Sequence, residues 1–106
     1  MQEISATEAA QMLHDQPEQT ILLDVREAME LEMAAVEGAL HIPMGEIPGR
    51  LAEIDAGMTI ICMCRSGGRS AQVVEFLVAQ GYGNAVNLAG GIHSWSDLID
   101  SSIPKY

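Results

Sequence analysis

Short apolar runs alternate with helical patterns along the whole chain. The apolar runs are mostly continuous rather than alternating with polar residues. Continuous runs are typical of strands buried on both faces, as in a parallel sheet that is covered by helices. The pattern predicts about five short strands, over residues 2–4, 21–25, 39–42, 58–63 and 85–88.

Helical patterns occupy the intervals between these runs. Ser5-Ala6-Thr7-Glu8 fits a capping box and predicts a helix that continues to about His14. Further helices are expected over residues 27–35, 46–54 and 70–80, and after the Gly90-Gly91 pair, whereas residues 101–106 are expected to be irregular.

Apolar positions share one face in three of these helices. They are Met29, Met33 and Val36 in the second helix, Ile47, Leu51 and Ile54 in the third, and Ile92, Trp95, Leu98 and Ile99, which are expected to face inward, in the last. We also expect the seven methionines to fill the core rather than a binding surface.

No linker, repeat or low-complexity segment interrupts the alternation. At 106 residues, the chain is the usual size of one domain with one core. The predicted fold class is therefore α/β: a single three-layer domain over residues 1–106, with a parallel central sheet of about five short strands and helices on both faces.

The charge of the chain limits its partners. The formal net charge is −10, which argues against nucleic acid and anionic membranes. The apolar runs are too short to span a bilayer, and residues 1–20 lack the apolar core of a signal peptide, so a cytoplasmic location is expected. Two of the five cations, Arg65 and Arg69, lie within one short loop. That concentration predicts a small anion as the ligand there.

The loop in question is Cys64-Arg65-Ser66-Gly67-Gly68-Arg69-Ser70, between a predicted strand and a predicted helix. A helix N-terminus gathers unpaired N–H groups and the positive end of the helix dipole. Together with the two arginines, this position favours a thiolate, the nucleophilic form of cysteine. Cys64 is therefore the candidate catalytic residue.

The second thiol, Cys62, lies on the same face of the same strand as Cys64. A disulfide between them is geometrically awkward, and His14, His41 and His93 show no metal-ligand spacing with the pair, so no metal site and no cofactor is expected. Cys62 is expected to be a small buried strand residue, and a resolving thiol for Cys64 is the alternative.

The spacing from Cys64 to Arg69 discriminates between two chemistries. Protein tyrosine phosphatases use C-x5-R, whose cradle surrounds a tetrahedral phosphate. Here the spacing is C-x4-R. A cradle one residue shorter suits a single sulfur atom better than a phosphate with three equatorial oxygens.

The loop resembles the active-site loop of single-domain rhodaneses, which are sulfurtransferases. Three other segments agree with that family and appear in the expected order: Asp24-Val25-Arg26-Glu27, Glu37-Gly38-Ala39-Leu40-His41-Ile42-Pro43, and Asn87-Leu88-Ala89-Gly90-Gly91-Ile92-His93-Ser94-Trp95. One departure is Ala34-Ala35-Val36-Glu37-Gly38, which lacks a histidine that many members carry before the third strand. That histidine is not the sulfur carrier, so the departure bears on packing or substrate preference.

The resemblance implies a sulfane sulfur transfer through a persulfide on Cys64. The donor would be a small anion such as thiosulfate, and the acceptor a thiophile such as cyanide, a thiol or a protein. Gly67 and Gly68 are expected to let the loop turn inward, and Arg65 to attract the donor. Arg69 would hold either the loop or a substrate oxygen.

Other residues of the motifs have alternative roles. Ser66 is a candidate hydroxyl donor to the sulfur, and Ser70 is either part of the site or only a helix N-cap. Asp24 and Arg26 are expected to be structural, His41 and His93 bystanders, and Trp95 part of the core. A phosphatase or arsenate reductase of related fold, and a rhodanese-like binding or sulfur-relay module, remain competing functions.

Overall fold

The computed structural model describes residues 2–106 and contains a five-stranded sheet in which every neighbouring pair of strands is parallel. The strand order is β1-β5-β4-β2-β3. This confirms the predicted parallel sheet, and Met1 lies outside the described residues. The strands are β1 (Glu3–Ile4), β2 (Thr20–Asp24), β3 (Leu40–His41), β4 (Thr59–Met63) and β5 (Ala85–Leu88).

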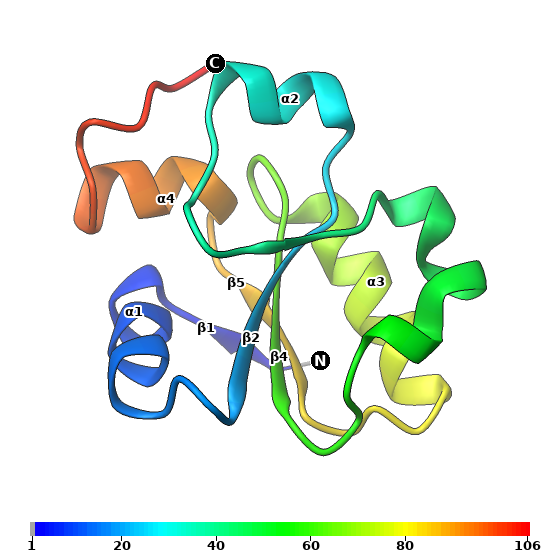
Figure 1. The fold of residues 1–106 in the computed structure, drawn as a ribbon. Coiled ribbons are helices and arrows are strands. Elements are labelled where there is room, and N and C mark those ends of the chain that lie inside the picture. The colour runs from blue at the N-terminus through cyan, green and yellow to red at the C-terminus, as the bar shows by residue number, and fades with distance from the viewer. Residues whose placement is uncertain (1) are drawn as a thin grey trace.

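Helices cover both faces of this sheet, as predicted (Figure 1). The helices are α1 (Ala6–Asp15), α2 (Ala28–Met33), α3 (Gly68–Ala79) and α4 (Gly91–Leu98), with a 3-10 helix, η1, over Met44–Glu53. Helices α1 and α4 contribute to one apolar core and helices α3 and η1 to the other, with the sheet between them. Ser5 caps α1 by accepting a hydrogen bond from the Glu8 amide at 3.1 Å, while Glu8 accepts one from the Ser5 amide at 3.2 Å, which confirms the capping box.

The third helix differs from its prediction because it is 3-10 rather than α-helical. Its backbone departs from helical geometry at Arg50, after Pro48 and Gly49. Its predicted apolar face is nevertheless confirmed: Ile47 and Ile54 are buried, and Leu51 packs against the same core.

Two predictions about side-chain burial are wrong. Leu98 and Ile99, expected to face inward, are 61% and 38% exposed because they lie at the end of α4, beyond the part that packs on the sheet. Met29 and Met33 are 62% and 48% exposed, so the methionines do not all fill the core. Helix α2 buries none of its own residues, because it lies beyond the ends of the strands instead of on a face of the sheet (Figure 1).

The alternation of side chains along β4 sets up the site. Ile60 and Cys62 face the core shared with α3, and Ile61 and Met63 face the opposite core. Cys64, the next residue, belongs to the same core as Cys62, which confirms the prediction that the two thiols share a face. No helix within residues 2–106 is long and apolar enough to cross a membrane.

Candidate active site

Cys64 follows β4 at the carboxyl end of the sheet, and the loop after it leads directly into α3 (Figure 1). Strand β4 is the central strand of the sheet, between β5 and β2, so the loop lies at the middle of the side where the strands have their carboxyl ends. Ligands of open parallel sheets bind at this edge, outside the carboxyl ends of the strands. The fold therefore places the candidate nucleophile where a ligand can be held.

The sulfur of Cys64 is surrounded by hydrogen-bond donors. The Gly67 amide donates to Sγ at 3.1 Å, and Ser70 Oγ lies 3.3 Å from Sγ. Burial raises the pKa of the Cys64 thiol. The Ser70 hydroxyl and the backbone amides of Ser70, Gly67 and Ser66 lower it, and the net result is a pKa below its ordinary value. The arrangement favours an anionic sulfur even though Cys64 is only 1% exposed.

Cys62 has the opposite environment. It is fully buried among apolar side chains, and this burial raises the pKa of its thiol to about 12. A thiol of that kind stays protonated and is a poor nucleophile. The structure therefore supports the expectation of a buried strand residue over the alternative of a resolving thiol.

Two glycine positions shape the loop. Gly67 has φ of +115° and is the N-cap of α3, a conformation that L side chains rarely adopt. Gly91 has φ of +58°, and a Cβ placed on it would lie 2.4 Å from the carbonyl oxygen of Cys64. The Ile92 amide donates a hydrogen bond to that same oxygen at 2.9 Å, so the Gly90-Gly91 turn packs directly against the backbone of Cys64 and fixes its position. The glycine pair therefore makes a tight turn that opens the last helix, in agreement with the helix predicted there.

Gly68 and Ser66 do not have the roles expected for them. Gly68 is the first residue of α3, and a Cβ added to it would meet no atom within 4 Å, so the inward turn of the loop needs Gly67 alone. The backbone amide of Ser66, and not its hydroxyl, is among the groups that lower the pKa of the Cys64 thiol.

Ser70 is part of the site and is not a helix N-cap. It lies within α3 and is fully buried, and its Oγ lies 2.6 Å from Asn87 Oδ1, so Asn87 Oδ1 and Cys64 Sγ are alternative acceptors for its single hydroxyl proton. Asn87 in turn donates from Nδ2 to the carbonyl oxygen of Gly67 at 3.1 Å. The buried side-chain amide of Asn87 on β5 therefore contacts both Ser70 and Gly67, the two residues that contact the sulfur. The sequence contained Asn87 within the fourth motif, but did not show this contact.

Arg69 binds a carboxylate of this chain rather than standing free for a substrate. Its guanidinium makes two hydrogen bonds to Glu30 of α2, at 2.5 and 2.9 Å. Of the two roles expected for Arg69, the structure supports holding the loop. Sequence reasoning missed Glu30, because no local signal links residues so far apart in the chain.

The Arg69–Glu30 pair predicts a pH dependence of stability. The hydrogen bonds from Arg69 lower the pKa of Glu30 to about 2, from an ordinary value of 4.5. Stabilisation from a lowered carboxyl pKa is complete above the unfolded value and is lost as the pH falls toward the folded value. We expect the free energy of unfolding to decrease by about 1–2 kcal/mol between about pH 4.5 and 2, as Glu30 is protonated. The decrease is limited to this size because Arg69 is partly exposed and solvent weakens the pair. Urea titrations across this window would measure it, and an equal slope in Glu30→Gln would contradict it.

Asp24 and Arg26 form a buried ion pair, as expected of structural residues. Their side chains are 1% and 0% exposed, and Arg26 donates to Asp24 from Nη2 at 2.7 Å and from Nε at 2.9 Å. Arg26 Nη2 also donates to the carbonyl oxygen of Ala34 at 2.9 Å, and His41 Nε2 lies 2.6 Å from the carbonyl oxygen of Arg26. The pair thus fixes the segments on both sides of α2.

Arg65 differs from the other cations of residues 2–106, because it alone has no aspartate or glutamate partner. The other four are paired: Arg26 with Asp24, Arg50 with Glu46 and Glu53, Arg69 with Glu30, and Lys105 with Asp97. Arg65 is exposed beside the nucleophile, and its guanidinium contacts Tyr106. In a chain with three times as many acidic as basic residues, a guanidinium without an acidic side-chain partner is a candidate to bind an anion.

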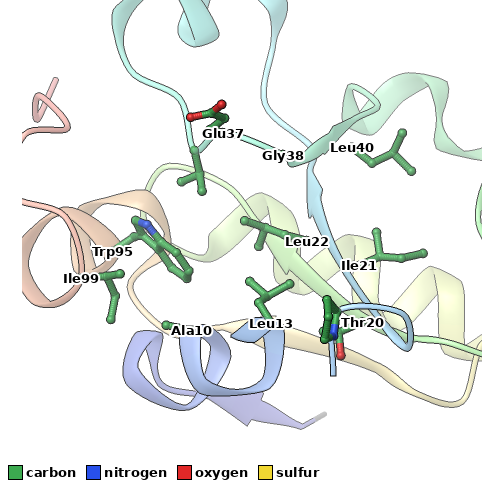
Figure 2. Close-up of a pocket in the computed structure, with 12 residues that line it drawn as sticks. Ala10, Leu13, Thr20, Ile21, Leu22, Glu37, Gly38, Leu40, Trp95 and Ile99 are labelled. Atoms are coloured by element: carbon green, nitrogen blue, oxygen red, sulfur yellow. The ribbon is translucent and has the colours of Figure 1, made fainter. Parts of the chain in front are cut away.

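A groove of about 560 Å³ lies elsewhere, on the α1 and α4 side of the sheet. Trp95, Leu13 and Leu22 form part of its wall (Figure 2), and Trp95 is buried as expected. None of residues 64–70 lines it. The groove is therefore separate from the candidate site.

Comparisons with known proteins agree with this fold. The rhodanese-like domain family matches residues 5–98, so the chain belongs to that family. A sulfurtransferase of Allochromatium vinosum is 39% identical over 94 residues, which cover 89% of this chain and 87% of that protein. An adenylyltransferase and sulfurtransferase of Zea mays is 30% identical over 101 residues, and the match covers 89% of this chain but 21% of that protein.

Solved structures give the same result. A rhodanese-like domain protein from Staphylococcus aureus superposes with a TM-score of 0.84 at 33% identity, covering 100% of this chain and 99% of that one. A protein from Rhodopseudomonas palustris described as a possible tyrosine phosphatase superposes with a TM-score of 0.82 at 15% identity, covering 100% of this chain and 85% of that one, which shows the shared fold alone. Together with the sulfurtransferase relatives, these findings support a rhodanese-like role in sulfur transfer.

Proposed function

We propose that this protein moves a sulfane sulfur from a small anionic donor such as thiosulfate to a thiophilic acceptor, either cyanide or a thiol, through a persulfide on Cys64. The observation that carries the proposal is the environment of Sγ. The Gly67 amide and the Ser70 hydroxyl reach the sulfur, and Arg65, which pairs with no acidic side chain, is the next residue of the same loop. A site of this kind stabilises a negative sulfur and admits an anion.

The reaction needs no other oxidant or reductant. The Cys64 thiolate attacks the outer sulfur of thiosulfate and forms a new S–S bond. The S–S bond within thiosulfate breaks, and sulfite leaves with the bonding electron pair. The persulfide that remains on Cys64 carries the negative charge on its outer sulfur. The acceptor, for example cyanide, then attacks that sulfur, thiocyanate leaves, and the Cys64 thiolate returns.

The residues of the loop have distinct parts in this scheme. The Gly67 amide and the Ser70 hydroxyl hold the negative charge, first on Sγ and then on the persulfide. Arg65 supplies the charge that draws the dianionic donor toward a site in an otherwise acidic chain. Arg69 positions the loop through its ion pair with Glu30.

The proposal is tested by intact mass after the purified protein is incubated with thiosulfate and excess reagent is removed. We expect a gain of one sulfur atom, which cyanide then removes as thiocyanate. A protein that gains no sulfur from thiosulfate or from any other sulfane donor would instead be a binding module.

The phosphatase alternative makes a different demand on Arg69. A C-x5-R cradle uses its arginine to bind phosphate oxygens, whereas Arg69 binds Glu30 through both nitrogens of its fork. Hydrolysis of an aryl phosphate faster than sulfur transfer would favour the phosphatase over the sulfurtransferase.

A sulfur relay between proteins is the second candidate, because the domain occurs as a small part of a larger relative in Zea mays. In a relay, Cys64 would still carry the persulfide, but another protein would supply or accept the sulfur. Persulfide formation from a protein donor without turnover of free thiosulfate would favour this candidate.

Removing the charge of Arg65 gives a direct test of donor recruitment. In Arg65→Ala, we expect the rate of persulfide formation from thiosulfate to fall by about five- to thirtyfold, the effect of about 1–2 kcal/mol between one cation and a dianion near water. Alkylation by neutral iodoacetamide should change far less. If both rates fell equally, Arg65 would tune the thiol rather than recruit the donor.

A further inference from the structure

Residues 101–106 have no helix or strand, as expected, yet they are firmly docked. Ile103 is 8% exposed and belongs to the core beneath α4. Ser96 Oγ donates to the carbonyl oxygen of Ile103 at 2.7 Å, and Lys105 pairs with Asp97. These contacts bring Tyr106 to the neighbourhood of α2 and the Cys64 loop (Figure 1).

The hydroxyl of Tyr106 is anchored at both of its hydrogen-bonding positions. It donates to Glu30 Oε2 at 2.7 Å and accepts from Arg26 Nη1 at 2.8 Å. Both partners are themselves fixed, Arg26 by its buried pair with Asp24 and Glu30 by Arg69. The ring of Tyr106 therefore has a defined place beside the loop.

That ring lies against the guanidinium of Arg65. The Cζ atom of Arg65 is 5.1 Å from the ring centroid, within the range of a cation–π contact. Arg65 Nη2 also donates to the main-chain oxygen of Tyr106. His93 packs edge-on against the same ring, with centroids 6.0 Å apart, and its Nε2 lies 3.1 Å from the same main-chain oxygen. Arg65 is thus held by an aromatic face, by His93 Nε2 at 3.4 Å and by a main-chain oxygen, and not by an aspartate or glutamate side chain.

We propose that Tyr106 is a positioning residue that fixes the guanidinium of Arg65 in the Cys64 loop and thereby sets the preference of the site for anionic reagents. This inference rests on the proposed function, because it explains how the donor is recruited. An aromatic face orients a guanidinium without neutralising it, whereas a carboxylate in the same place would cancel its charge. An oxygen of the anionic donor replaces the main-chain oxygen of Tyr106 at Nη2, and the contact with the ring remains.

Two alkylating reagents of similar size but different charge measure the preference of the site for anions. Iodoacetate is an anion and iodoacetamide is neutral, so the ratio of their rate constants at Cys64 reports the attraction of anions. Limited access to the buried sulfur affects both reagents and cancels in the ratio. Cys62 does not interfere, because burial raises the pKa of its thiol to about 12.

The informative pair of variants is Tyr106→Leu and Tyr106→Phe. Both lose the hydroxyl, but only Phe keeps the aromatic face. We expect Tyr106→Leu to lower the iodoacetate-to-iodoacetamide ratio by about two- to fivefold, and Tyr106→Phe to retain most of it. Tyr82→Leu is the matched control. Its hydroxyl donates to the Leu51 carbonyl oxygen beyond the far end of α3, so the ratio should not change.

A double-mutant cycle decides whether Tyr106 acts through Arg65. In an Arg65→Ala background, Tyr106→Leu should have no further effect on the ratio. The proposal is overturned by an unchanged ratio in Tyr106→Leu, by a ratio that rises because the tail had been screening Arg65, or by an equal loss with and without Arg65. Circular dichroism of each variant confirms that the fold is kept.

The two proposals fail separately in this design. Alkylation needs only a reactive Cys64 and no sulfur chemistry. A protein that takes no sulfur from thiosulfate but shows the expected ratios would contradict the proposed function and leave the role of Tyr106 intact.

Discussion

Cys64→Ser is expected to take up no sulfur from thiosulfate, while Cys62→Ser takes it up like the unchanged protein. The reason is the contrast between two thiols on one face of one strand. Hydrogen bonds from the loop lower the pKa of the Cys64 thiol, whereas burial raises that of Cys62 to about 12. Of the two thiols, Cys64 therefore forms the thiolate more readily, and a serine hydroxyl in its place remains protonated and cannot carry a persulfide.

Intact mass after incubation with thiosulfate measures both variants in the same way. Cys62→Ser is the matched control, because it makes the same substitution two residues earlier in the same core. Thermal unfolding should show that both variants remain folded. If Cys64→Ser still gained a sulfur atom, or if Cys62→Ser lost the gain while folded, the persulfide would not lie on Cys64.

The arrangement of elements could be read from the sequence because it depends on short-range patterns. Continuous apolar runs predicted the parallel strands, and Ser5 with Glu8 predicted the first helix cap. The loop was found for the same reason, since a cysteine, two glycines and an arginine stand within six residues of one another. Local features of this kind carry their own evidence in the chain.

Burial could be predicted less well, because periodicity marks a face without showing what covers it. Met29 and Met33 share a helix face, but α2 extends beyond the sheet and nothing in residues 2–106 buries them. Leu98 and Ile99 continue the apolar pattern of α4 past the end of its packing surface. In both cases, the tertiary position of the helix decides the outcome.

The partners of the site residues could not be predicted, since each lies far from the loop in the sequence. Glu30 binds Arg69, Asn87 holds Ser70, and Tyr106 holds Arg65. Each of these contacts decides between roles that the motif alone leaves open. Arg69 binds Glu30 through its fork, and Arg65 contacts the ring and the main-chain oxygen of Tyr106 instead of an acidic side chain.

The Asp24–Arg26 pair connects these contacts to the stability of the whole fold. Arg26→Met would leave the carboxylate of Asp24 buried without its cation. Removing one partner of a buried ion pair typically costs about 3–5 kcal/mol, far more than the same change at the surface. We therefore expect the free energy of unfolding of Arg26→Met to fall by about that amount, as measured by urea denaturation at neutral pH.

Arg50→Met is the control for this experiment. Arg50 also binds two carboxylates, Glu46 and Glu53, but its side chain is 34% exposed and its partners are more exposed still. Solvent screens such pairs, so the loss should be much smaller than in Arg26→Met. A double variant, Asp24→Leu with Arg26→Met, should recover part of the stability lost in Arg26→Met, because it removes the unpaired buried charge. If Arg26→Met cost no more than Arg50→Met, or if the double variant were less stable than Arg26→Met alone, the penalty would not come from an unpaired buried carboxylate.

Because Arg26 also donates to the Tyr106 hydroxyl, Arg26→Met should also lower the iodoacetate-to-iodoacetamide ratio at Cys64 under conditions where the variant remains folded.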